Sequence, residues 1–174
     1  TAHPKVVAIG EIGLDYYYDL TPREVQKLWF REQIELAKQI DIPIIYHSRE
    51  ATKDMLDVIA DTRAYDVGGV MHCFGGSLET AEKLVDWGLY LGIGGTVTFK
   101  NAEKIKRVVE GIALDYLLIE TDCPYLSPEP KRGRRNDSTH IPYIAEAIAR
   151  IKGITPEEVI ELTARNAKRL FEIK

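Results

Sequence analysis

Short apolar runs that end at polar residues constrain the fold more than any other feature of this sequence. The runs are Val6–Ile9, Ile42–Tyr46, Gly69–Met71, Leu89–Ile93 and Tyr116–Ile119, and they are mostly apolar without alternation. Strands that are buried on both faces of a parallel sheet have this pattern. We therefore expect five parallel strands.

Segments with helical periodicity separate these runs. Thr21, Pro22 and Glu24 predict a helix start, and this helix extends to about Ile40. Its expected buried stripe is Val25, Leu28, Trp29, Leu36 and Ile40, with Phe30 and Ile34 outside it. The further expected helices are Ala51–Ala60, Leu78–Trp87, Asn101–Glu110, one lined by Ile144, Ile148 and Ile151, and a last one that begins with the capping box of Thr155, Pro156 and Glu158.

Alternating strands and helices predict an α/β fold with right-handed crossovers. A five-stranded doubly wound sheet suits 174 residues. A (β/α)₈ barrel takes roughly 250 residues, so this chain would hold about five of its eight units. No linker or low-complexity tract divides the sequence, which indicates a single domain over residues 1–174.

The chain is acidic, with 23 basic and 27 acidic residues and a net charge of −4. A polyanion would therefore have to be held by a local basic site or by a metal rather than by the whole surface. Cys73 and Cys123 do not form a disulfide framework, and we expect free thiols in a cytoplasmic protein. The sequence has no apolar run of membrane-spanning length and no signal-peptide pattern.

Residues able to bind metal follow four of the five expected strands: Glu11, His47, His72 and Asp122. The carboxyl ends of strands are where α/β folds hold their catalytic groups, so these side chains are expected to meet at one rim. Two imidazoles and two carboxylates suit a divalent first-row metal, which would acidify water. One histidine alone would more often be structural. His3 and His140 are expected on the surface, and Cys73 and Cys123 are expected to point away from the metal.

Six segments, taken together and in order, resemble the TatD family of metal-dependent deoxyribonucleases. They are GEIGLDYYYD, PIIYHSREA, GGVMHCFGGSLETA, LGIGGTVTFKNA, LLIETDCPYLSPEPKRGRRN and LTARNAKRLF, and they cover essentially the whole chain. The resemblance implies a distorted TIM barrel and a divalent-metal phosphodiesterase. Its expected partner is DNA, at single-stranded ends, with 3′ to 5′ exonuclease activity.

The resemblance also implies roles for individual residues. Glu11 would be a ligand shared between two metal positions, and His47 and His72 would bind the second metal. Asp122 would be a ligand that also orients the attacking water, so Glu11 and Asp122 are the expected catalytic residues. A complete site would hold two divalent ions, Mg, Mn or Zn.

One departure from the family pattern concerns the N-terminal strand. The family begins with a strand that carries a His-x-His pair, and this sequence contains no such pair. The chain resembles the C-terminal two-thirds of the family. We therefore predict an incomplete TIM-type (β/α)₈ barrel made of strands 4–8, without the N-terminal βα units, that holds at most one metal well.

Basic and aromatic residues near these segments are candidates for substrate binding. Lys131, Arg132, Arg134 and Arg135 form a basic run beyond Asp122. The run is expected to contact phosphate, although a solvated loop would have the same composition. Arg49 is expected to stabilise charge on phosphate, or to pair with Glu50 or Asp54. One of the three consecutive tyrosines Tyr16, Tyr17 and Tyr18 is expected to stack on a base, with Tyr17 as the candidate, although these rings could equally pack a loop.

Three functions are compatible with these features. The first is hydrolysis of DNA phosphodiester bonds. The second keeps the metal but cleaves an ester, as in D-aminoacyl-tRNA deacylation. The third is an inactive truncated barrel that acts as a binding subunit, a reading that the missing His-x-His pair favours.

Overall fold

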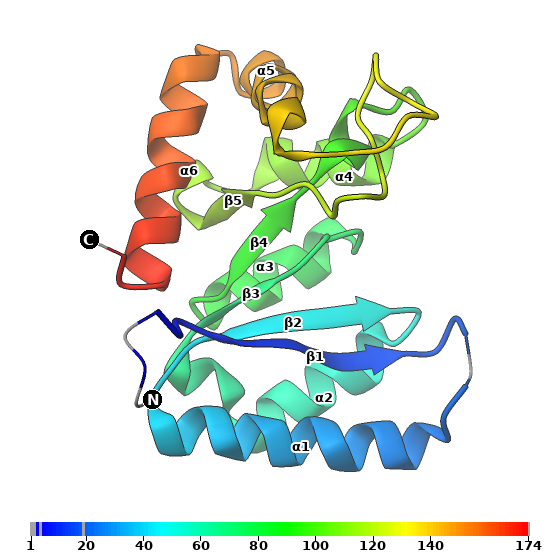
Figure 1. Ribbon diagram of the computed structural model, residues 1–174, viewed down its shortest axis with the longest axis vertical. Coiled ribbons are helices and arrows are strands. Elements are labelled where there is room, and N and C mark those ends of the chain that lie inside the picture. The colour runs from blue at the N-terminus through cyan, green and yellow to red at the C-terminus, as the bar shows by residue number, and fades with distance from the viewer. Residues whose placement is uncertain (1–2, 4, 19, 174) are drawn as a thin grey trace.

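Five parallel strands form one sheet whose spatial order is the order of the sequence (Figure 1). The computed structural model describes residues 3, 5–18 and 20–173. The strands are β1 (Ile9–Asp15), β2 (Ile44–Arg49), β3 (Gly69–Met71), β4 (Tyr90–Ile93) and β5 (Leu117–Ile119). Within this part of the chain β1 and β5 are the edge strands. Parallel pairing brings all five carboxyl ends to the same side of the sheet.

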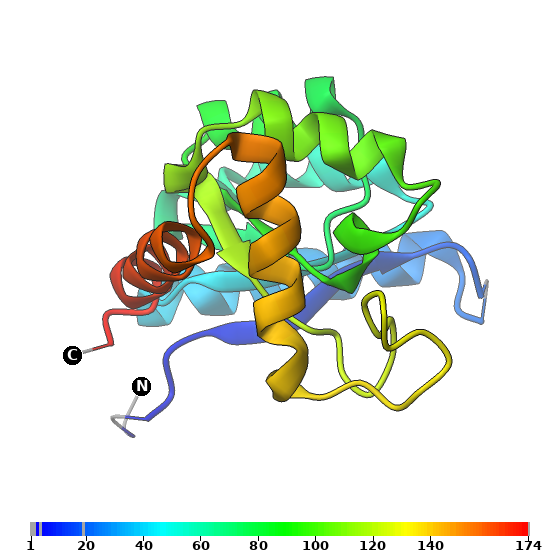
Figure 2. The ribbon, with the colours of Figure 1, turned by 90° about the horizontal axis from the view of Figure 1, so that it is seen from above.

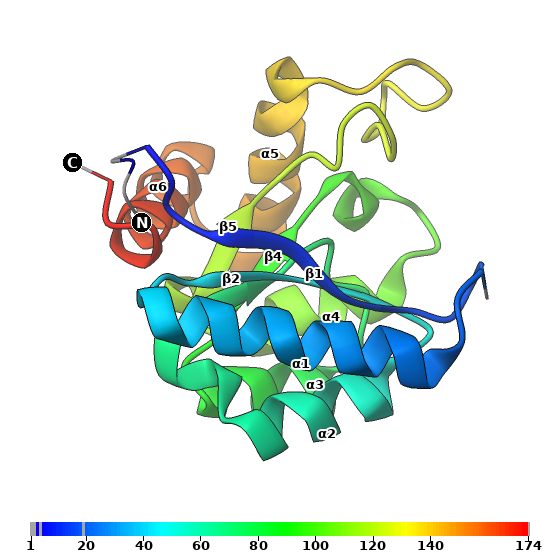
Figure 3. The same cartoon turned by 60° about the horizontal axis from the view of Figure 1, so that its bottom comes forward.

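Helices connect the strands and cover the sheet. They are α1 (Arg23–Ile40), α2 (Thr52–Thr62), α3 (Leu78–Asp86), α4 (Glu103–Gly111), α5 (Ile141–Lys152) and α6 (Pro156–Leu170). Helices α1 and α2 lie beside one another next to β1 and β2 (Figure 3). Helices α5 and α6 pack together against β5 (Figure 2). In the described part of the chain, no helix has the length and apolar character needed to cross a membrane.

Successive strand residues pack into two different cores because their side chains point to opposite faces of the sheet. Met71, Leu91 and Leu117 belong to the main core between the sheet and the helices. The neighbouring residues on the other face form a smaller cluster with the end of α6: Val70, Tyr90, Leu118, Ala167, Leu170 and Phe171. Burial on both faces explains why the strands read as uninterrupted apolar runs.

The first two strands differ from their predicted bounds. The prediction of β3 at Gly69–Met71 is confirmed, but β1 is Ile9–Asp15 instead of Val6–Ile9, and β2 extends to Arg49. Pairing between the strands continues past the apolar runs, up to Asp15 opposite Arg49. In β1, Ile12 and Leu14 alternate with more polar or small residues and are still buried in the main core. Glu11 and His47 therefore lie inside strands and not after them.

The predicted buried face of α1 is wrong. Trp29 is 62% exposed and Leu28 is 55% exposed, whereas Phe30 is 1% exposed and Ile34 is fully buried. Phe30, Ile34 and Ala37 form the buried stripe at helical spacing. The sequence pattern favoured the face with more apolar residues, but contact with the sheet and α2 decided which face is buried. The start of α1 also lacks the predicted side-chain cap.

The capping box of α6 is confirmed. The Glu158 backbone N–H donates to Thr155 Oγ1 at 3.2 Å, and the Thr155 backbone N–H donates to Glu158 Oε2 at 2.8 Å. Gly153 ends α5 at a φ of 69°, a left-handed conformation that glycine adopts without steric cost. Residues 152–158 therefore form a sharp connection that is specified locally, which is why the sequence predicts it correctly.

Two alanine substitutions on α1 test which face of this helix is buried. Phe30→Ala is expected to lower the free energy of unfolding by about 3–5 kcal/mol, because it leaves a cavity in the main core. Trp29→Ala, one residue away, is expected to change it by less than about 0.5 kcal/mol. Urea denaturation followed by circular dichroism measures both values. Equal effects of the two substitutions would contradict the observed orientation of α1.

Candidate metal centre

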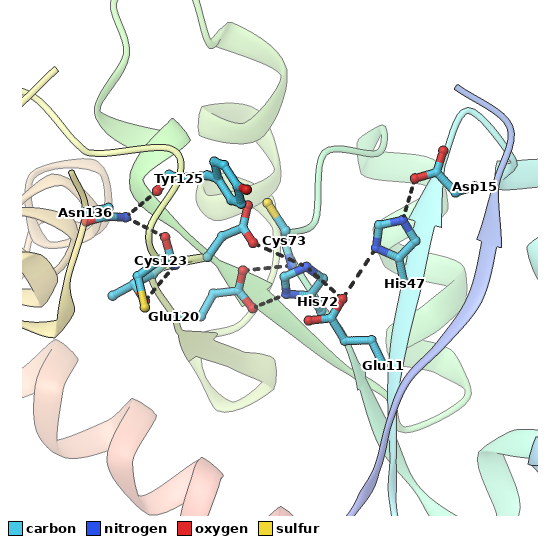
Figure 4. A network of polar contacts seen from close by, with 11 residues as sticks. Glu11, Asp15, His47, His72, Cys73, Glu120, Cys123, Tyr125 and Asn136 are labelled. Atoms are coloured by element: carbon cyan, nitrogen blue, oxygen red, sulfur yellow. Dashed lines mark hydrogen bonds and ion pairs between the residues drawn. The ribbon is translucent and has the colours of Figure 1, made fainter. Parts of the chain in front are cut away.

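Glu11 lies at an irregularity in β1. Gly10 pairs with Ile45 and Ile12 pairs with Tyr46, so Glu11 is an extra residue without a partner in the parallel register. A bulge of this kind changes the direction of a side chain, and such bulges are frequent beside active sites. The Glu11 carboxylate turns toward the carboxyl ends of β2 and β3 (Figure 4).

His47 faces Glu11 from β2, and the close approach of β1 to β2 at this level requires a glycine. Gly13, opposite His47, has a φ of 151°, and a Cβ atom there would overlap the His47 carbonyl oxygen. His47 Nε2 lies 3.0 Å from Asp15 Oδ2, while Nδ1 lies 3.6 Å from Glu11 Oε2. The Asp15 carboxylate thus pairs with the outer nitrogen, Nε2, and the inner nitrogen, Nδ1, points to Glu11.

His72 directly follows β3 and has the same arrangement with its nitrogens exchanged. Its backbone N–H donates to the Tyr46 carbonyl at 3.0 Å. Nδ1 lies 3.2 Å from Glu120 Oε2, and Nε2 lies 3.7 Å from Glu11 Oε2. Glu120 is fixed in turn, because its Oε1 accepts the Cys73 backbone N–H at 2.9 Å. A carboxylate that binds one imidazole nitrogen fixes the tautomer that a metal ligand needs on the other.

Three of the four predicted ligands converge. The ligand atoms of Glu11, His47 and His72 all lie within 4.8 Å of one another (Figure 4). Two imidazole nitrogens and one carboxylate oxygen are donors that divalent first-row metals accept. Asp122 is adjacent, with Oδ1 3.9 Å from His72 Nε2. The donor set therefore fits a divalent cation, which Glu11, His47 and His72 would hold and Asp122 would approach.

Electrostatics in this cluster favour a protonated His72 when no metal is bound. The hydrogen bond to Glu120 raises the pKa of His72 above its ordinary value of 6.5, desolvation opposes this, and the charges of Glu120, Glu11 and Asp122 add to the increase. Burial raises the pKa of Asp122, and the charges of Glu120 and Glu11 raise it further. His72 and His47 lower this pKa, but by less. Several carboxylates are crowded around few positive charges, which favours binding of a cation.

Two functional carboxylates were not predicted from the sequence. Asp15 ends β1 and accepts backbone N–H groups of Tyr17 and Tyr18 as well as pairing with His47. Burial raises the pKa of Asp15, but these hydrogen bonds lower it by more, so the net pKa is below its ordinary value and the ionised form is favoured. Glu120 directly follows β5, so the strand-end rule that selected Asp122 could also have found it. Asp15 was missed because the predicted strand ended at Ile9.

The remaining cysteine and histidine predictions have mixed outcomes. His3 is exposed as expected. The prediction that His140 lies on the surface is wrong, because its exposed fraction is 8%. Cys73 is half-buried and lines the same cleft as the cluster, whereas Cys123 is exposed. Burial, with the charges of Glu120, Asp122 and Glu11, raises the pKa of the Cys73 thiol to about 12. Cys73 is therefore a neutral thiol and a poor metal ligand in this state.

A cleft of about 850 Å³ opens in front of the cluster. Its walls include Glu11, His47, His72, Asp122, Arg49 and Lys104. The Arg49 guanidinium lies 3.9 Å from the centre of the Tyr17 ring and 5.1 Å from that of Tyr18. Tyr18, and not Tyr17, lines the cleft. Arg49 therefore lines the cleft while its guanidinium packs over the Tyr17 and Tyr18 rings. Lys104, which also lines the cleft, was not predicted from the sequence.

The four residues of the basic run stand on the loop between β5 and α5. Among the described residues that line the cleft, none belongs to this run. Arg132 lies over the Phe99 ring at 3.8 Å and Lys131 over the Tyr143 ring at 5.8 Å. Arg134 and Arg135 are exposed. Aromatic contacts therefore hold the first half of the run, and its second half faces solvent.

Comparisons with known proteins agree with this fold and identify the family. The family described as TatD related DNase matches residues 1–172. The Bacillus subtilis protein YabD, named an uncharacterized metal-dependent hydrolase, is 53% identical over 99% of this chain. The 3'-5' ssDNA/RNA exonuclease TatD of Salmonella typhimurium is 37% identical over 98% of the chain. The crystal structure of YJJV, a TatD homolog from Escherichia coli, superposes with a TM-score of 0.91 at 33% identity over 98% of the chain.

A parallel α/β sheet with imidazoles and carboxylates gathered at its carboxyl rim is consistent with a metal-dependent hydrolase, the class for which YabD is named. This chain belongs to the TatD family. It spans 68% of the length of YabD, 67% of the Salmonella protein and 66% of the YJJV structure. The family match over residues 1–172 does not support the prediction of an incomplete barrel, and the numbering of these strands as the fourth to the eighth stays a prediction.

The raised pKa of His72 predicts how metal affinity depends on pH. Because metal binds only the neutral imidazole, affinity is expected to fall about tenfold per pH unit below that pKa. Glu120→Gln removes the charge that stabilises the imidazolium, so its affinity should begin to fall at lower pH than that of wild type. Calorimetric titration with Mn²⁺ between about pH 6 and 8 measures this, and one tight site is expected.

In the metal-free protein, the pH dependence of the free energy of unfolding tests the raised pKa of His72 independently of metal binding. A raised folded-state pKa contributes stability that is complete below 6.5 and is lost as pH rises through the folded value. Glu120→Gln should therefore lose less stability than wild type as the pH is raised through this range. Glu146→Gln, an exposed carboxylate on α5, is the matched control. Identical pH dependence in wild type and Glu120→Gln would contradict the assigned cause.

Proposed function

We propose that this chain carries the catalytic centre of a metal-dependent hydrolase that cleaves DNA phosphodiester bonds, removing nucleotides from single-stranded 3′ ends. One observation carries the proposal: His47 Nδ1, His72 Nε2 and Glu11 Oε2 point at a common position within 4.8 Å of one another. The opposite nitrogens of the two imidazoles are held by Asp15 and Glu120. Such an arrangement holds ligand nitrogens ready for a cation without reorganisation.

A bound divalent cation would supply Lewis acidity for charge on phosphate oxygens and would make water more acidic. Glu11, His47 and His72 would hold it, and Asp122 would complete the set. Each imidazole must stay neutral for this, and the pairing with Asp15 or Glu120 directs its remaining proton to the outer nitrogen. The second ion of the predicted two-metal site is not part of the proposal for this chain.

Proton and phosphate handling fall to residues on the cleft walls. Asp122 Oδ1 would accept a proton from the attacking water, and its raised pKa makes it a stronger base than an exposed aspartate. The water oxygen forms a bond to phosphorus while the bond from phosphorus to the 3′ oxygen breaks. The leaving oxygen takes a proton from solvent. Arg49 would donate to a non-bridging phosphate oxygen, where negative charge develops.

A nucleic acid substrate is supported by the charge distribution and by a relative. The chain has a net charge of −4, yet Arg49 and Lys104 stand on the cleft walls. Lys131, Arg132, Arg134 and Arg135 are gathered on one loop. Local basic residues on an acidic protein favour a polyanion that is held at one place. The relative from Salmonella typhimurium is named a 3'-5' ssDNA/RNA exonuclease.

Substitution of Asp122 tests the proposed activity. Asp122→Asn is expected to lower kcat by about 10²–10⁴-fold, since it removes a general base while preserving shape. His72→Ala and treatment with a chelator are each expected to abolish cleavage, and His3→Ala, an imidazole outside the cluster, should retain it. The assay follows shortening of a 5′-labelled single-stranded oligonucleotide. Full activity of Asp122→Asn or His72→Ala would overturn the assignment.

The same assay separates substrates. Oligonucleotides of DNA and RNA, a blunt duplex and a D-aminoacyl-tRNA are compared at equal protein concentration. Stepwise loss from the 3′ end of single-stranded DNA is the expected result. Hydrolysis of the aminoacyl ester without shortening of DNA would show that the site acts on a different bond. Metal binding without hydrolysis of any of these would indicate a binding protein.

The basic loop is expected to contribute to binding rather than to chemistry. The double variant Arg134→Ala and Arg135→Ala should raise KM with little change in kcat. Each lost phosphate contact should reduce the slope of log affinity against log salt by about 0.7 for a single strand, so about 1.4 for two. Fluorescence anisotropy with a labelled oligonucleotide measures this slope. Lys168→Ala with Arg169→Ala, two exposed basic residues on α6, is the control and should leave it unchanged.

A further inference from the structure

One buried asparagine bonds to the backbone of the turn that carries Asp122. Asn136 is 1% exposed and lies at the end of the basic loop. Its Nδ2 donates to the Thr121 carbonyl at 2.6 Å and to the Tyr125 carbonyl at 2.7 Å (Figure 4). Its backbone N–H donates to the Pro124 carbonyl at 3.1 Å. All three donors of Asn136 therefore go to residues 121–125.

The turn needs such support because of its conformation. Asp122 has a φ of 52°, in the left-handed region that residues other than glycine seldom adopt. Within the turn, the Tyr125 N–H donates to the Asp122 carbonyl at 2.9 Å. Unusual backbone conformations persist only where the surroundings over-determine them. The carbonyls that Asn136 binds lie on both sides of Asp122, so this one side chain spans the unusual residue.

His140 determines how the Asn136 carboxamide is oriented. Carbonyl oxygens only accept hydrogen bonds, so the amide nitrogen of Asn136 must face Thr121 and Tyr125. Its Oδ1 then faces His140 Nδ1 at 2.8 Å, and His140 must donate from Nδ1. His140 is buried where the short 3₁₀ turn Ser138–His140 meets α5. The buried histidine thus has a definite partner and leaves the carboxamide one arrangement in which all groups are paired.

We infer that Asn136 is a positioning residue that keeps the Asp122 carboxylate at the metal cluster, with His140 fixing the orientation of the Asn136 side chain. The inference rests on the proposed function for the role of Asp122. It also gives the basic loop a second role. The residues between Tyr125 and Asn136 form a segment whose ends are joined by these bonds, so the loop and the Asp122 turn are one unit.

Asn166 offers a matched control within the same chain. It is fully buried, and its Nδ2 likewise donates to two carbonyls, those of Leu114 and Leu117, each at 2.9 Å. Leu114 lies in the 3₁₀ turn Leu114–Tyr116 just before β5 and Leu117 begins this strand, whereas Asp122 follows its end. Asn166→Ala, like Asn136→Ala, removes two side-chain hydrogen bonds to backbone carbonyls, but at the end of β5 away from the cluster.

The closing experiment compares these variants by two measurements. Hydrogen exchange of the amides of residues 122–126 is followed in the metal-free protein, and Mn²⁺ affinity is measured by calorimetry. Asn136→Ala is expected to speed exchange of the Tyr125 amide at least about tenfold and to weaken Mn²⁺ binding about 10–100-fold, the range for groups that orient metal ligands. Asn166→Ala should change both by less than about twofold, even if it lowers stability to a similar extent.

Variants of His140 keep the test decisive if Asn136→Ala does not fold. His140→Leu removes the Nδ1 donor and should shift both measurements in the direction of Asn136→Ala, while His140→Gln, which can still donate, should restore them at least in part. Exchange in Asn136→Ala or His140→Leu equal to that in Asn166→Ala would overturn the inference. The exchange measurement needs neither metal nor DNA, so failure of wild type to cleave DNA would count against the proposed function alone.

Discussion

Parallel pairing of β1 with β2 and of β2 with β3 is the constraint on which the site depends. It brings Glu11, His47 and His72 to one rim from three neighbouring strands. Parallel register alone would leave Glu11 at the wrong level, and the extra residue between Gly10 and Ile12 corrects this. The site therefore follows from backbone hydrogen bonding at the centre of the sheet and from one local irregularity at its edge.

The cluster combines groups whose mutual repulsion would be costly without a cation. Glu11, Glu120 and Asp122 surround His72. The hydrogen bond to Glu120 is the main cause that raises the pKa of His72, and burial, helped by the charges of Glu120 and Glu11, raises the pKa of Asp122. Protonation of His72 would partly offset this negative charge. A divalent cation does the same more completely, which is why proton and metal compete for the site. Asp15 and Glu120 keep the imidazoles oriented in either state.

Two regions support this centre from outside. Arg49, held over Tyr17 and Tyr18, places a positive charge at the cleft without an acidic partner among its described contacts. The loop after β5 carries Asp122 and the basic run, and the Asn136 side chain, at the far end of this loop, donates hydrogen bonds to the carbonyls of Thr121 and Tyr125 at its beginning. These two regions, the end of β2 and the loop after β5, border the cluster that Glu11, His47 and His72 form.

Much of this site could be predicted from the sequence, because burial on both faces of the sheet leaves apolar runs whose ends are easy to find. Those ends pointed to Glu11, His47, His72 and Asp122, and the capping box of α6 was equally local. Only the tertiary structure decided that Phe30 and not Trp29 is buried, that β1 continues to Asp15, and that His140 lies inside. Each of these depends on which surface another element covers or on pairing with a distant strand, and periodicity within one segment carries no information about either.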